Sequence, residues 1–450
     1  MKEFDAIVVG AGSGLDIASV FASHGKNVAL VEPGPLGGTC LNRGCIPSKM
    51  LIHRADIVET IRRSEKFHIN AQVEEIDFEN IVQEVNNSVS SDAEGIEKAV
   101  EKSENHTLYK EKARFVDEKV LKIGDERITA DKIFLAAGSR PLIPPIEGIT
   151  SIDYLTSKEA LQLDEKPDSM VMIGGGYISC ELAHFFEAMG VEVTIIEGGD
   201  SLLKREDREI SEKFTEIAGR RFNVNLGMFA SKVEELEDGI KVVAEDGGGN
   251  KHSFAGEKIL LAAGRVPNTD ELNVKAAGIK TSERGFIEVD EKMETNKDGI
   301  YAIGDIADNW MFKHSANYEA EIAIKNAFGK KEIADYRSMP HAVFSSPQIA
   351  GVGKTEQKLE EENVDYIKAS YEYKNTGMGH ALKEKDGFVK MLASQEGDIL
   401  GCHIIGPDAS QLIHEVLVAE RNDLGVEGIK DTIHIHPALN EVVQRAFNQI

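Results

Sequence analysis

Two cysteines with four residues between them, Cys40 and Cys45, lie in the segment GGTCLNRGCIPSK at residues 37–49. Two thiols held this close along the chain can form and break a disulfide, which is the chemistry of thiol–disulfide exchange. Buried structural thiols and a metal site are the alternatives, but CxxxxC is not a usual zinc spacing and the sequence has no second cysteine pair to complete the ligand set. We therefore predict a redox-active pair and no metal site. Cys180 and Cys402 lie in apolar stretches and are interpreted as inert core thiols.

The residues around Cys45 predict that it begins a helix. Gly44 precedes it, and Pro47 is tolerated in a first helical turn. A helix N-terminus lowers the pKa of a thiol and so favours the thiolate that exchange requires. Lys49 follows one turn later on the same face and adds positive charge.

A base for this exchange is predicted near the end of the chain, in the segment HIHPALNE at residues 434–441. Taken alone, His434 and His436 are more often structural side chains than catalysts. Exchange needs a group that takes and returns a proton, and histidine titrates near the working pH. Glu441 could orient the ring, as the third member of a nucleophile, base and orienting set.

The elements that position the cysteines begin with a strand, a glycine-rich turn, a helix and a second strand. The apolar run at residues 4–9 ends in Gly10-Ala11-Gly12-Ser13-Gly14, and the second strand, 27–32, ends in Glu32. Leu15 occupies the third glycine position of a GxGxxG fingerprint, so the loop alone is a weak signal. Glu32 lies roughly 20 residues after the first glycine, where an acid binds a ribose hydroxyl. Dinucleotide binding is therefore predicted.

The same design recurs later, so the sequence predicts a second dinucleotide unit. The strand at 170–173 leads into Gly174 and Gly176, Ser179 stands at the third glycine position, and the next strand ends in Glu197. A carboxylate there accepts hydrogen bonds from a free 2′-hydroxyl and repels a 2′-phosphate, which favours NAD(H) over NADP(H). Because Lys204 and Arg205 lie nearby, NADP(H) remains an alternative cofactor.

The domain organisation follows from these repeats. Each unit closes with an apolar strand and a glycine turn, at 133–141 and again at 259–267, and prolines at 141, 144 and 145 mark the first boundary. After Tyr336 strands and helices continue without a nucleotide loop. We predict an α/β fold with two Rossmann-like domains and a C-terminal α+β domain. The boundaries are 1–148 with 270–336 for the first domain, 149–269 for the second and 337–450 for the third.

Composition excludes several classes of partner. The chain has 450 residues and a formal charge of −26, which argues against nucleic acid or an anionic membrane as a partner. No run of 18 or more apolar residues occurs and the start lacks a secretory signal pattern, so a cytoplasmic location is expected.

Together these motifs resemble the FAD-dependent pyridine nucleotide-disulfide oxidoreductases. Within this family the segments are most similar to those of mycothione reductase and dihydrolipoyl dehydrogenase. The segment at 37–49 is highly specific for the family, whereas the glycine loops alone are not. The resemblance covers essentially the whole chain. It implies FAD on the first unit, NAD(P) on the second, and a C-terminal interface domain that forms a homodimer.

The resemblance also implies roles for single residues. Cys40 would attack the substrate, and Cys45 would contact the flavin. Lys49 would lie at the flavin ring and pair with Glu181, with Tyr177 as an aromatic gate. His436 and Glu441 would reach the cysteines of the partner subunit. The implied FAD contacts are Gly10, Gly12, Ser13, Gly14, Glu32, Gly38, Thr39, Lys49, Ala113, Gly138, Asp305 and Lys313. The implied NAD(P) contacts are Gly174, Gly176, Tyr177, Ile178, Glu197, Val233 and Gly264.

The predicted function is reduction of a low-molecular-weight thiol disulfide with NAD(P)H through Cys40 and Cys45. The alternative is dihydrolipoyl dehydrogenase, in which the same residues oxidise dihydrolipoamide and reduce NAD. Both remain possible because the reduction potentials of the two couples set the direction of the reaction. A flavoprotein with a purely structural role is disfavoured, since such a role needs none of the cysteines, Lys49 or His436. The sequence leaves the identity of the disulfide open.

Overall fold

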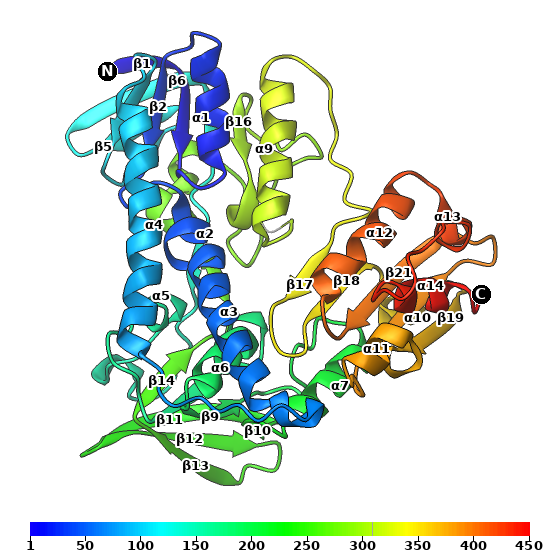
Figure 1. Ribbon diagram of the computed structural model, residues 1–450. Helices are drawn as coiled ribbons and strands as arrows, with labels where there is room; N and C mark the ends of the chain where they lie inside the picture. Colours follow the sequence, from blue (N-terminus) through cyan, green and yellow to red (C-terminus); the bar gives the residue numbers. More distant parts are fainter. Residues whose placement is uncertain (308) are drawn as a thin grey trace. The chain divides into compact units, whose positions relative to one another are not determined.

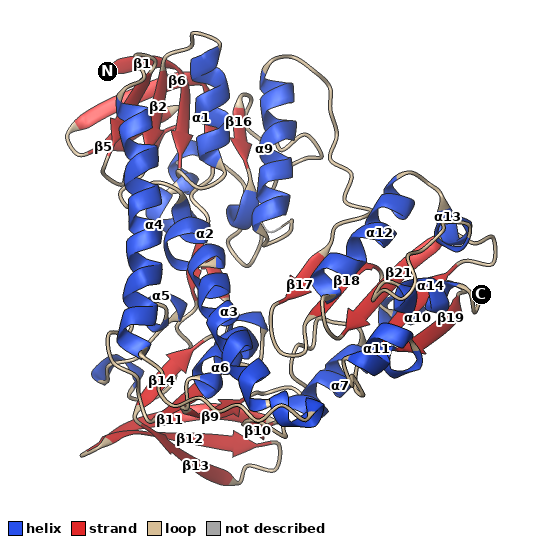
Figure 2. Ribbon diagram, in the orientation of Figure 1, coloured by secondary structure: helices blue, strands red, loops and turns tan. Residues whose placement is uncertain are grey.

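The computed structural model describes residues 1–307 and 309–450. Its contacts divide the chain into two compact units. The first comprises Met1–Ser48, Val82–Leu142 and Gly264–Asp335, and the second comprises Lys49–Ile81, Ile143–Ala263 and Tyr336–Ile450. The fold is of the predicted α/β class (Figures 1 and 2). The three domain boundaries proposed from the sequence stay a prediction.

The first unit is built on a seven-stranded sheet with the order β3-β2-β1-β6-β5-β4, in which β16 also pairs with β6. The strands are β1 (Lys2–Val9), β2 (Val28–Val31), β3 (His106–Tyr109), β4 (Ala113–Asp117), β5 (Val120–Ile123), β6 (Glu126–Leu135) and β16 (Ile300–Ala302). Parallel pairing joins β3, β2, β1, β6 and β16, whereas β4 and β5 are antiparallel. The two helices α1 (Gly14–Ser23) and α9 (Lys313–Ala327) pack side by side (Figure 1).

The burial of β1 explains why its sequence is a nearly continuous apolar run. Ala6, Ile7 and Val8 are each 0% exposed, because a central parallel strand is covered on both faces. Ile7 belongs to one hydrophobic cluster, and Ala6 and Val8 belong to the cluster that includes α1 and α9 residues. A short antiparallel pair, β7 (Ser139–Pro141) and β15 (Arg265–Pro267), joins the two glycine turns that the sequence showed as a repeat.

The second unit repeats the strand, loop, helix and strand of the first. Its parallel sheet has the order β10-β9-β8-β14, and α6 connects β8 to β9. A three-stranded antiparallel sheet, β11-β12-β13, packs with it around one hydrophobic cluster. The bounds are β8 (Ser169–Ile173), α6 (Tyr177–Ala188), β9 (Glu192–Ile196), α7 (Arg208–Ala218), β10 (Asn223–Asn225), β11 (Met228–Leu236), β12 (Gly239–Asp246), β13 (Lys251–Gly256) and β14 (Lys258–Leu261).

The C-terminal module of the second unit is an antiparallel sheet with the order β17-β18-β21-β20-β19, packed against helices (Figure 2). This is the predicted α+β module without a nucleotide loop. The bounds are β17 (His341–Val343), β18 (Ile349–Gly353), α10 (Glu356–Glu361), β19 (Ile367–Glu372), α11 (Gly377–Ala381), β20 (Phe388–Ala393), β21 (Ile399–Ile405), α12 (Ala409–Arg421), α13 (Gly425–Lys430) and α14 (Glu441–Phe447).

The cysteine segment is helical. The helix α2 (Gly38–Arg43) contains Cys40, and α3 (Cys45–Arg62) begins at Cys45, as predicted. A long helix, α4 (Phe78–Glu101), follows, and α3 and α4 each contribute residues to both units. Among the described residues, no helix is long and apolar enough to cross a membrane.

A fully buried lysine joins the C-terminal module to the nucleotide-binding part of the second unit. Lys390 on β20 is 0% exposed, and its Nζ lies 2.8 Å from Asp207 and 2.6 Å from Glu356. Burial alone would lower the pKa of Lys390, but the hydrogen bonds to Asp207 and Glu356 outweigh it and raise that pKa. The cation therefore neutralises carboxylates that could not be buried alone.

We expect Lys390→Met to cost about 3–5 kcal/mol of unfolding free energy, because Asp207 and Glu356 would lose their buried counter-charge. Lys354→Met is the matched control. Its pair with Glu362 is largely exposed and is worth less than about 1 kcal/mol. Denaturant titration of both variants measures the difference, and equal losses would contradict a special role for the buried ion.

Candidate active site

The two predicted nucleotide loops have the same backbone geometry. Gly10 and Gly174 adopt φ values of +103° and +104°, in the region that favours glycine. A Cβ at Gly10 would lie 2.2 Å from the carbonyl oxygen of Ala136, and one at Gly174 would lie 2.5 Å from that of Ala262. Each loop therefore needs glycine where its first strand turns into the helix, and the two loops contact equivalent strands.

The two acids at the ends of the second strands also match. The Glu32 carboxylate accepts hydrogen bonds from the N–H groups of Ala11 and Gly34, both at 3.0 Å. The Glu197 carboxylate accepts them from Gly175 at 2.6 Å and Gly199 at 2.7 Å. Each carboxylate is thus fixed beside its glycine loop, where a ribose hydroxyl would donate to it.

The departures from the glycine fingerprint have a structural explanation in the first loop. A Cβ at Gly14 would lie 2.8 Å from Val8 Cγ1 and 3.0 Å from the Ala136 Cβ. Gly14 therefore provides the close packing of helix on strand that the third glycine usually provides, and Leu15 need not. In the second loop Ser179 fills that position and is 0% exposed.

The cysteine segment lies directly on the first nucleotide loop. The Gly37 N–H donates to the Ala11 carbonyl at 2.9 Å, and a Cβ at Gly38 would lie 2.7 Å from the Cα of Gly12. Both Gly37 and Gly38 have positive φ. The two backbones touch where each has only hydrogen for a side chain, and α2, which carries Cys40, starts from this contact.

Cys40 and Cys45 differ in exposure. Cys40 is half-buried within α2, whereas Cys45 is exposed at the first residue of α3. Between the two helices, a Cβ at Gly44 would lie 2.8 Å from the Thr39 carbonyl oxygen, so the turn that separates the cysteines also requires glycine. Cys45 has the helix N-terminal position that favours a thiolate.

Polar side chains of the first unit surround Asp305. The Ser139 hydroxyl donates to Asp305 Oδ2 at 2.6 Å, and Arg265 Nε donates to Ser139 Oγ at 2.7 Å. Burial lowers the pKa of Arg265, and attraction to Asp305 only partly offsets this effect. Elsewhere in this unit, Lys313 Nζ donates to Ser13 Oγ at 2.9 Å, beside the first glycine loop.

The structure brings Lys49 and Glu181 together, as the resemblance implied. Lys49 Nζ lies 2.6 Å from Glu181 Oε2, and it also lies 4.8 Å from the centre of the Phe344 ring. The other oxygen of Glu181 accepts the Phe344 N–H at 2.9 Å. Both oxygens of the Glu181 carboxylate are therefore occupied, which fixes the position of the Lys49 ammonium.

The histidine and acid near the C-terminus also form a pair. His436 Nδ1 lies 3.0 Å from Glu441 Oε1, and the Ala438 N–H donates to Oε2 at 3.1 Å. The hydrogen bond with His436 lowers the pKa of Glu441. The His436 side chain is 74% exposed, whereas that of His434 is 3% exposed and faces Glu415. Of the two histidines, His436 alone has its ring both oriented and accessible.

The sequence of the whole chain matches one enzyme family. The profile of the pyridine nucleotide-disulphide oxidoreductases matches residues 4–320, and that of their dimerisation domain matches residues 339–447. The chain belongs to this family. It is therefore an oxidoreductase acting on sulfur groups, of an FAD-dependent family that binds NAD(P).

Several relatives match along nearly their full length. Dihydrolipoyl dehydrogenase of Chlamydia pneumoniae is 36% identical, covering 98% of this chain and 95% of the relative. Mycothione reductase of Mycobacterium tuberculosis is 34% identical, covering 99% of each chain. Among solved structures, the HOCl-induced flavoprotein disulfide reductase RclA of Escherichia coli, as its Cu(II) complex, has a TM-score of 0.89 at 27% identity and covers 100% of both chains.

The remaining implied contacts lie in the two units that contain the loops, most of them on other elements. Ala113 is 4% exposed at the start of β4, and Val233 is 3% exposed on β11. Gly138 and Gly264 follow β6 and β14, both with positive φ. Ile178 is the second residue of α6. Sequence reasoning missed Arg265 and Ser139, although both stand directly after the repeated glycine turns.

A group of metal-ligating side chains, Asp56, Glu59 and His184, could in principle hold an ion. However, Arg221 Nη2 lies 3.2 Å from His184 Nδ1, and the same guanidinium pairs with Glu187 at 2.5 Å and with Glu59 at 3.4 Å. A cation is already supplied by the protein, so we interpret the group as an ion-pair network.

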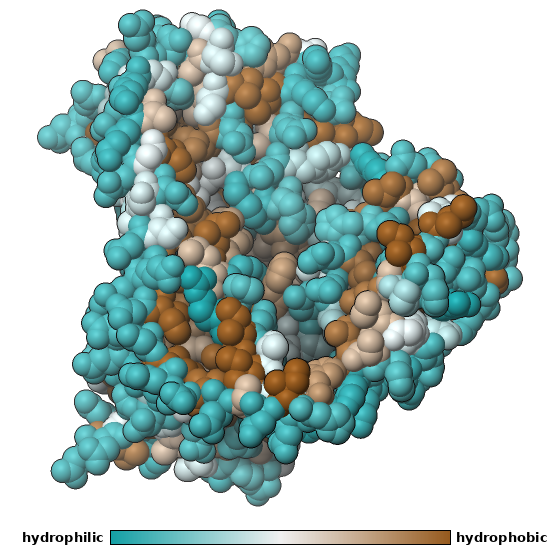
Figure 3. Space-filling model, in the orientation of Figure 1, coloured by the Kyte–Doolittle hydropathy of each residue, from teal (hydrophilic) through white to brown (hydrophobic). Residues whose placement is uncertain are grey.

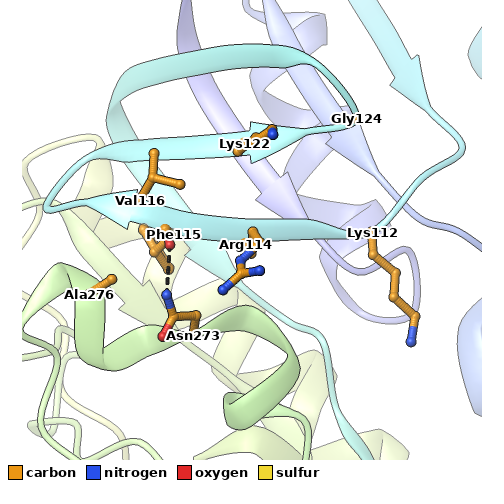
Figure 4. Close-up of a pocket in the computed structure, with 8 residues that line it drawn as sticks. All are labelled: Lys112, Arg114, Phe115, Val116, Lys122, Gly124, Asn273 and Ala276. Atoms are coloured by element: carbon orange, nitrogen blue, oxygen red, sulfur yellow. Dashed lines mark hydrogen bonds between the residues drawn. The ribbon is translucent and has the colours of Figure 1, made fainter.

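One pocket of about 490 Å³ lies beside β4 and β5. Of the predicted site residues, Ala113 stands in the sequence between two lining residues, Lys112 and Arg114. Figure 4 shows Arg114 and Lys122 on these strands, Lys112 directly before β4, and Asn273 donating to the Phe115 carbonyl, at 3.0 Å. Lys112 pairs with Glu271. The lining also includes the buried Phe115 and, outside the strands, Asn273 and Ala276, and it shares no residue with the nucleotide loops or the cysteine segment.

The C-terminal module exposes hydrophobic side chains. Ile433 is 97% exposed and Ile435 78%, and Val418 and Leu424 are also exposed on or after α12. Figure 3 shows hydrophobic patches over α12 and α13, among other such patches on this face. Such patches mark association surfaces, in agreement with the dimerisation-domain match.

We expect Gly38→Ala to weaken FAD retention and lower stability, because its Cβ would meet the Gly12 backbone. Gly25→Ala is the matched control: Gly25 also has positive φ, at +72°, but nothing lies within 4 Å of its Cβ position. Both variants carry the backbone cost of roughly 1–2 kcal/mol, and only Gly38→Ala adds overpacking of about 1–3 kcal/mol. Thermal unfolding with flavin release measures both, and equal effects would contradict the contact.

Proposed function

We propose that this enzyme reduces the disulfide of a low-molecular-weight thiol with NADH, through a redox-active disulfide between Cys40 and Cys45. The observation that carries this proposal is the backbone contact between the cysteine segment and the first nucleotide loop, at Gly12 and Gly38. A thiol pair built onto a nucleotide loop serves electron transfer between the nucleotide and the thiols.

FAD fits the first unit, and the contacts described above support the residues that the resemblance implies for holding it. The Glu32 carboxylate would accept from the adenosine ribose, and the α1 N-terminus would face the pyrophosphate. Asp305, with its carboxylate fixed by Ser139, would accept from the ribityl chain. When bound, the flavin passes an electron pair between the nicotinamide and the cysteines.

The two cysteines would carry out different steps of the thiol–disulfide exchange. The reduced Cys40 thiolate attacks one sulfur of the substrate disulfide, which forms a mixed disulfide and releases the first thiol. The Cys45 thiolate then attacks Cys40, which releases the second thiol and restores the Cys40–Cys45 disulfide. Each leaving thiolate takes a proton, and we assign that proton to His436 of the partner subunit, oriented by its Glu441.

This assignment requires a homodimer with shared active sites. It is supported by the dimerisation-domain match and by the exposed hydrophobic side chains of the C-terminal module. It is supported also by the 74% exposure of His436, which leaves its Nε2 available to another chain.

NADH is favoured as the electron donor because of Glu197. Its carboxylate stands at the end of β9, fixed by two backbone N–H groups, where it would accept from a 2′-hydroxyl. The Lys204 ammonium lies 3.9 Å from Glu197 and 68% of its side chain is exposed, so water and salt screen its attraction for a 2′-phosphate.

The second candidate is dihydrolipoyl dehydrogenase, in which the same residues oxidise a dithiol and reduce NAD. Glu197 favours it, and so do the relatives from Chlamydia pneumoniae and Bacillus subtilis, the latter 37% identical over 99% of this chain. The reduction potentials of the two couples decide the direction, at about 30 mV for each tenfold change in the equilibrium constant.

A steady-state panel separates the two candidates. NADH and NADPH are crossed with lipoamide, glutathione disulfide, bis-γ-glutamylcystine, coenzyme A disulfide and mycothione, in both directions. We expect reduction of one small disulfide to dominate and Cys40→Ser to abolish it. Dominant oxidation of dihydrolipoamide by NAD would favour the second candidate instead.

We expect Glu197→Ala to narrow the preference for NADH by tenfold or more in kcat/KM, about 1.4 kcal/mol, because the variant no longer repels a 2′-phosphate. Glu192→Ala, at the exposed start of the same strand, is the control and should leave the ratio unchanged. An unchanged NADH to NADPH ratio in Glu197→Ala would contradict the role given to this carboxylate.

A further inference from the structure

A phenylalanine ring lies beside the acid that follows β9 in the second unit. A Cβ at Gly198, the residue directly after Glu197, would lie 2.5, 2.9 and 2.9 Å from three carbons of the Phe229 ring. Only glycine therefore leaves room for the ring at this place. Phe229 is 64% exposed, so one side of its ring lies against the backbone and much of the rest faces solvent.

Backbone hydrogen bonds fix the position of Phe229. The Gly227 N–H donates to the Gly199 carbonyl at 2.8 Å, and the Met228 N–H donates to the Glu197 carbonyl at 3.0 Å. The start of β11 is thus joined to the segment that carries the acid. Because Phe229 is the next residue along β11, the fold itself sets its ring beside this segment.

The hydrophobic core does not require an aromatic side chain at residue 229. Met228 and Ala230, its neighbours on β11, pack against the hydrophobic cluster that the two sheets share. Since side chains alternate along a strand, Phe229 points to the opposite face. Single exposed hydrophobic residues are common on protein surfaces, so exposure alone carries no argument. The argument rests on the contact of this ring with the residue that follows Glu197.

The chemistry of NAD(H) brings a second flat ring to the same place. The Glu197 carboxylate, held by the N–H groups of Gly175 and Gly199, is proposed to accept a hydrogen bond from the 2′-hydroxyl of the adenosine ribose. The adenine is attached to C1′ of that ribose, next to the carbon that carries this hydroxyl. It must therefore lie close to the residues that follow Glu197, and aromatic rings attract each other by offset stacking.

We propose that Phe229 is a stacking platform for the adenine of NAD(H). The exposed side of the ring binds the base, and the Gly198 backbone supports the ring from the other side. The inference rests on the proposed NAD(H) site, to which it adds a residue outside both the glycine loop and the acid. Phe229 contributes affinity and no chemistry, because the adenine takes no part in hydride transfer.

Calorimetry on the FAD-loaded enzyme tests the platform with ADP-ribose, which has the adenosine and pyrophosphate of NAD and lacks the nicotinamide. We expect Phe229→Ala to bind ADP-ribose about tenfold more weakly than the wild type, because stacking on an aromatic side chain supplies a large share of the affinity for a base. Phe229→Tyr retains the ring and should bind as the wild type does. Phe229→Leu, apolar without a ring, should lose affinity to a smaller extent than Phe229→Ala.

The rate of flavin reduction, followed by absorbance under anaerobic conditions, separates the adenine from the rest of the nucleotide. NADH and reduced nicotinamide hypoxanthine dinucleotide both carry a purine, whereas reduced nicotinamide mononucleotide carries none. We expect Phe229→Ala to raise the half-saturating concentration of both dinucleotides about tenfold at an unchanged limiting rate, because stacking is equal in the ground and transition states and tolerates either purine. Reduction by the mononucleotide should not change.

Leu236→Ala is the matched control. Leu236 is another exposed hydrophobic side chain of β11, at 43%, and it lies at the opposite end of the strand. The variant should leave the affinity for ADP-ribose and the half-saturating concentrations of all three donors unchanged.

The outcomes separate the platform from the site on which it rests. Unchanged ADP-ribose binding in Phe229→Ala overturns the platform. An equal loss with the mononucleotide also overturns it, because the ring would then only support the fold of the segment. If the wild type binds neither ADP-ribose nor NADH, the proposed NAD(H) site itself is wrong. Phe229→Tyr keeps the contact with Gly198, so weak binding by this variant would equally contradict stacking.

Discussion

The contact between Gly12 and Gly38 is the constraint on which the rest of the site depends. The nucleotide loop and the cysteine segment approach each other backbone to backbone, and a single Cβ at Gly38 would come within 2.7 Å of the Gly12 Cα. Because the cysteine segment starts from this contact, the positions of Cys40 and of the turn to Cys45 follow from the position of the loop. The loop in turn is fixed by Gly10 and Gly14, which let α1 and β6 close around it.

A second constraint operates in the other unit, where basic side chains hold buried carboxylates in place. Lys390 with Asp207, Glu206 with His341, and Glu181 with Lys49 each join the nucleotide-binding part of that unit to another segment. Such pairs add little net stability compared with apolar packing, but losing one partner is costly. They therefore fix relative positions, which suits a helix, α6, whose first two turns carry Tyr177 and Glu181.

Local motifs explain what could be predicted from the sequence. Gly10, Glu32, Gly174 and Glu197 follow one chemical pattern within a short stretch, and the structure places both acids in the same backbone geometry. The start of α3 at Cys45 was predictable from its neighbours for the same reason. The family profile confirms the reaction class.

The groups that the sequence did not predict depend on long-range contacts. Glu206 meets His341, and Arg265 meets Ser139, only after the sheets have formed, and no spacing in the chain encodes these distances. Gly14 provides the close packing of helix on strand that a glycine at position 15 would otherwise provide. This could be recognised only from the position of Val8, which the structure gives. The choice among small disulfides depends on side chains outside the cysteine segment and the nucleotide loops, so these motifs do not predict it.

Reductive titration under anaerobic conditions tests the central claim most directly, namely that Cys40 and Cys45 form a second electron-pair acceptor beside the flavin. Because a disulfide and a flavin each take two electrons, the account predicts an uptake of about four electrons per FAD in the wild type and about two in Cys40→Ser. An uptake of about two electrons in the wild type would contradict it.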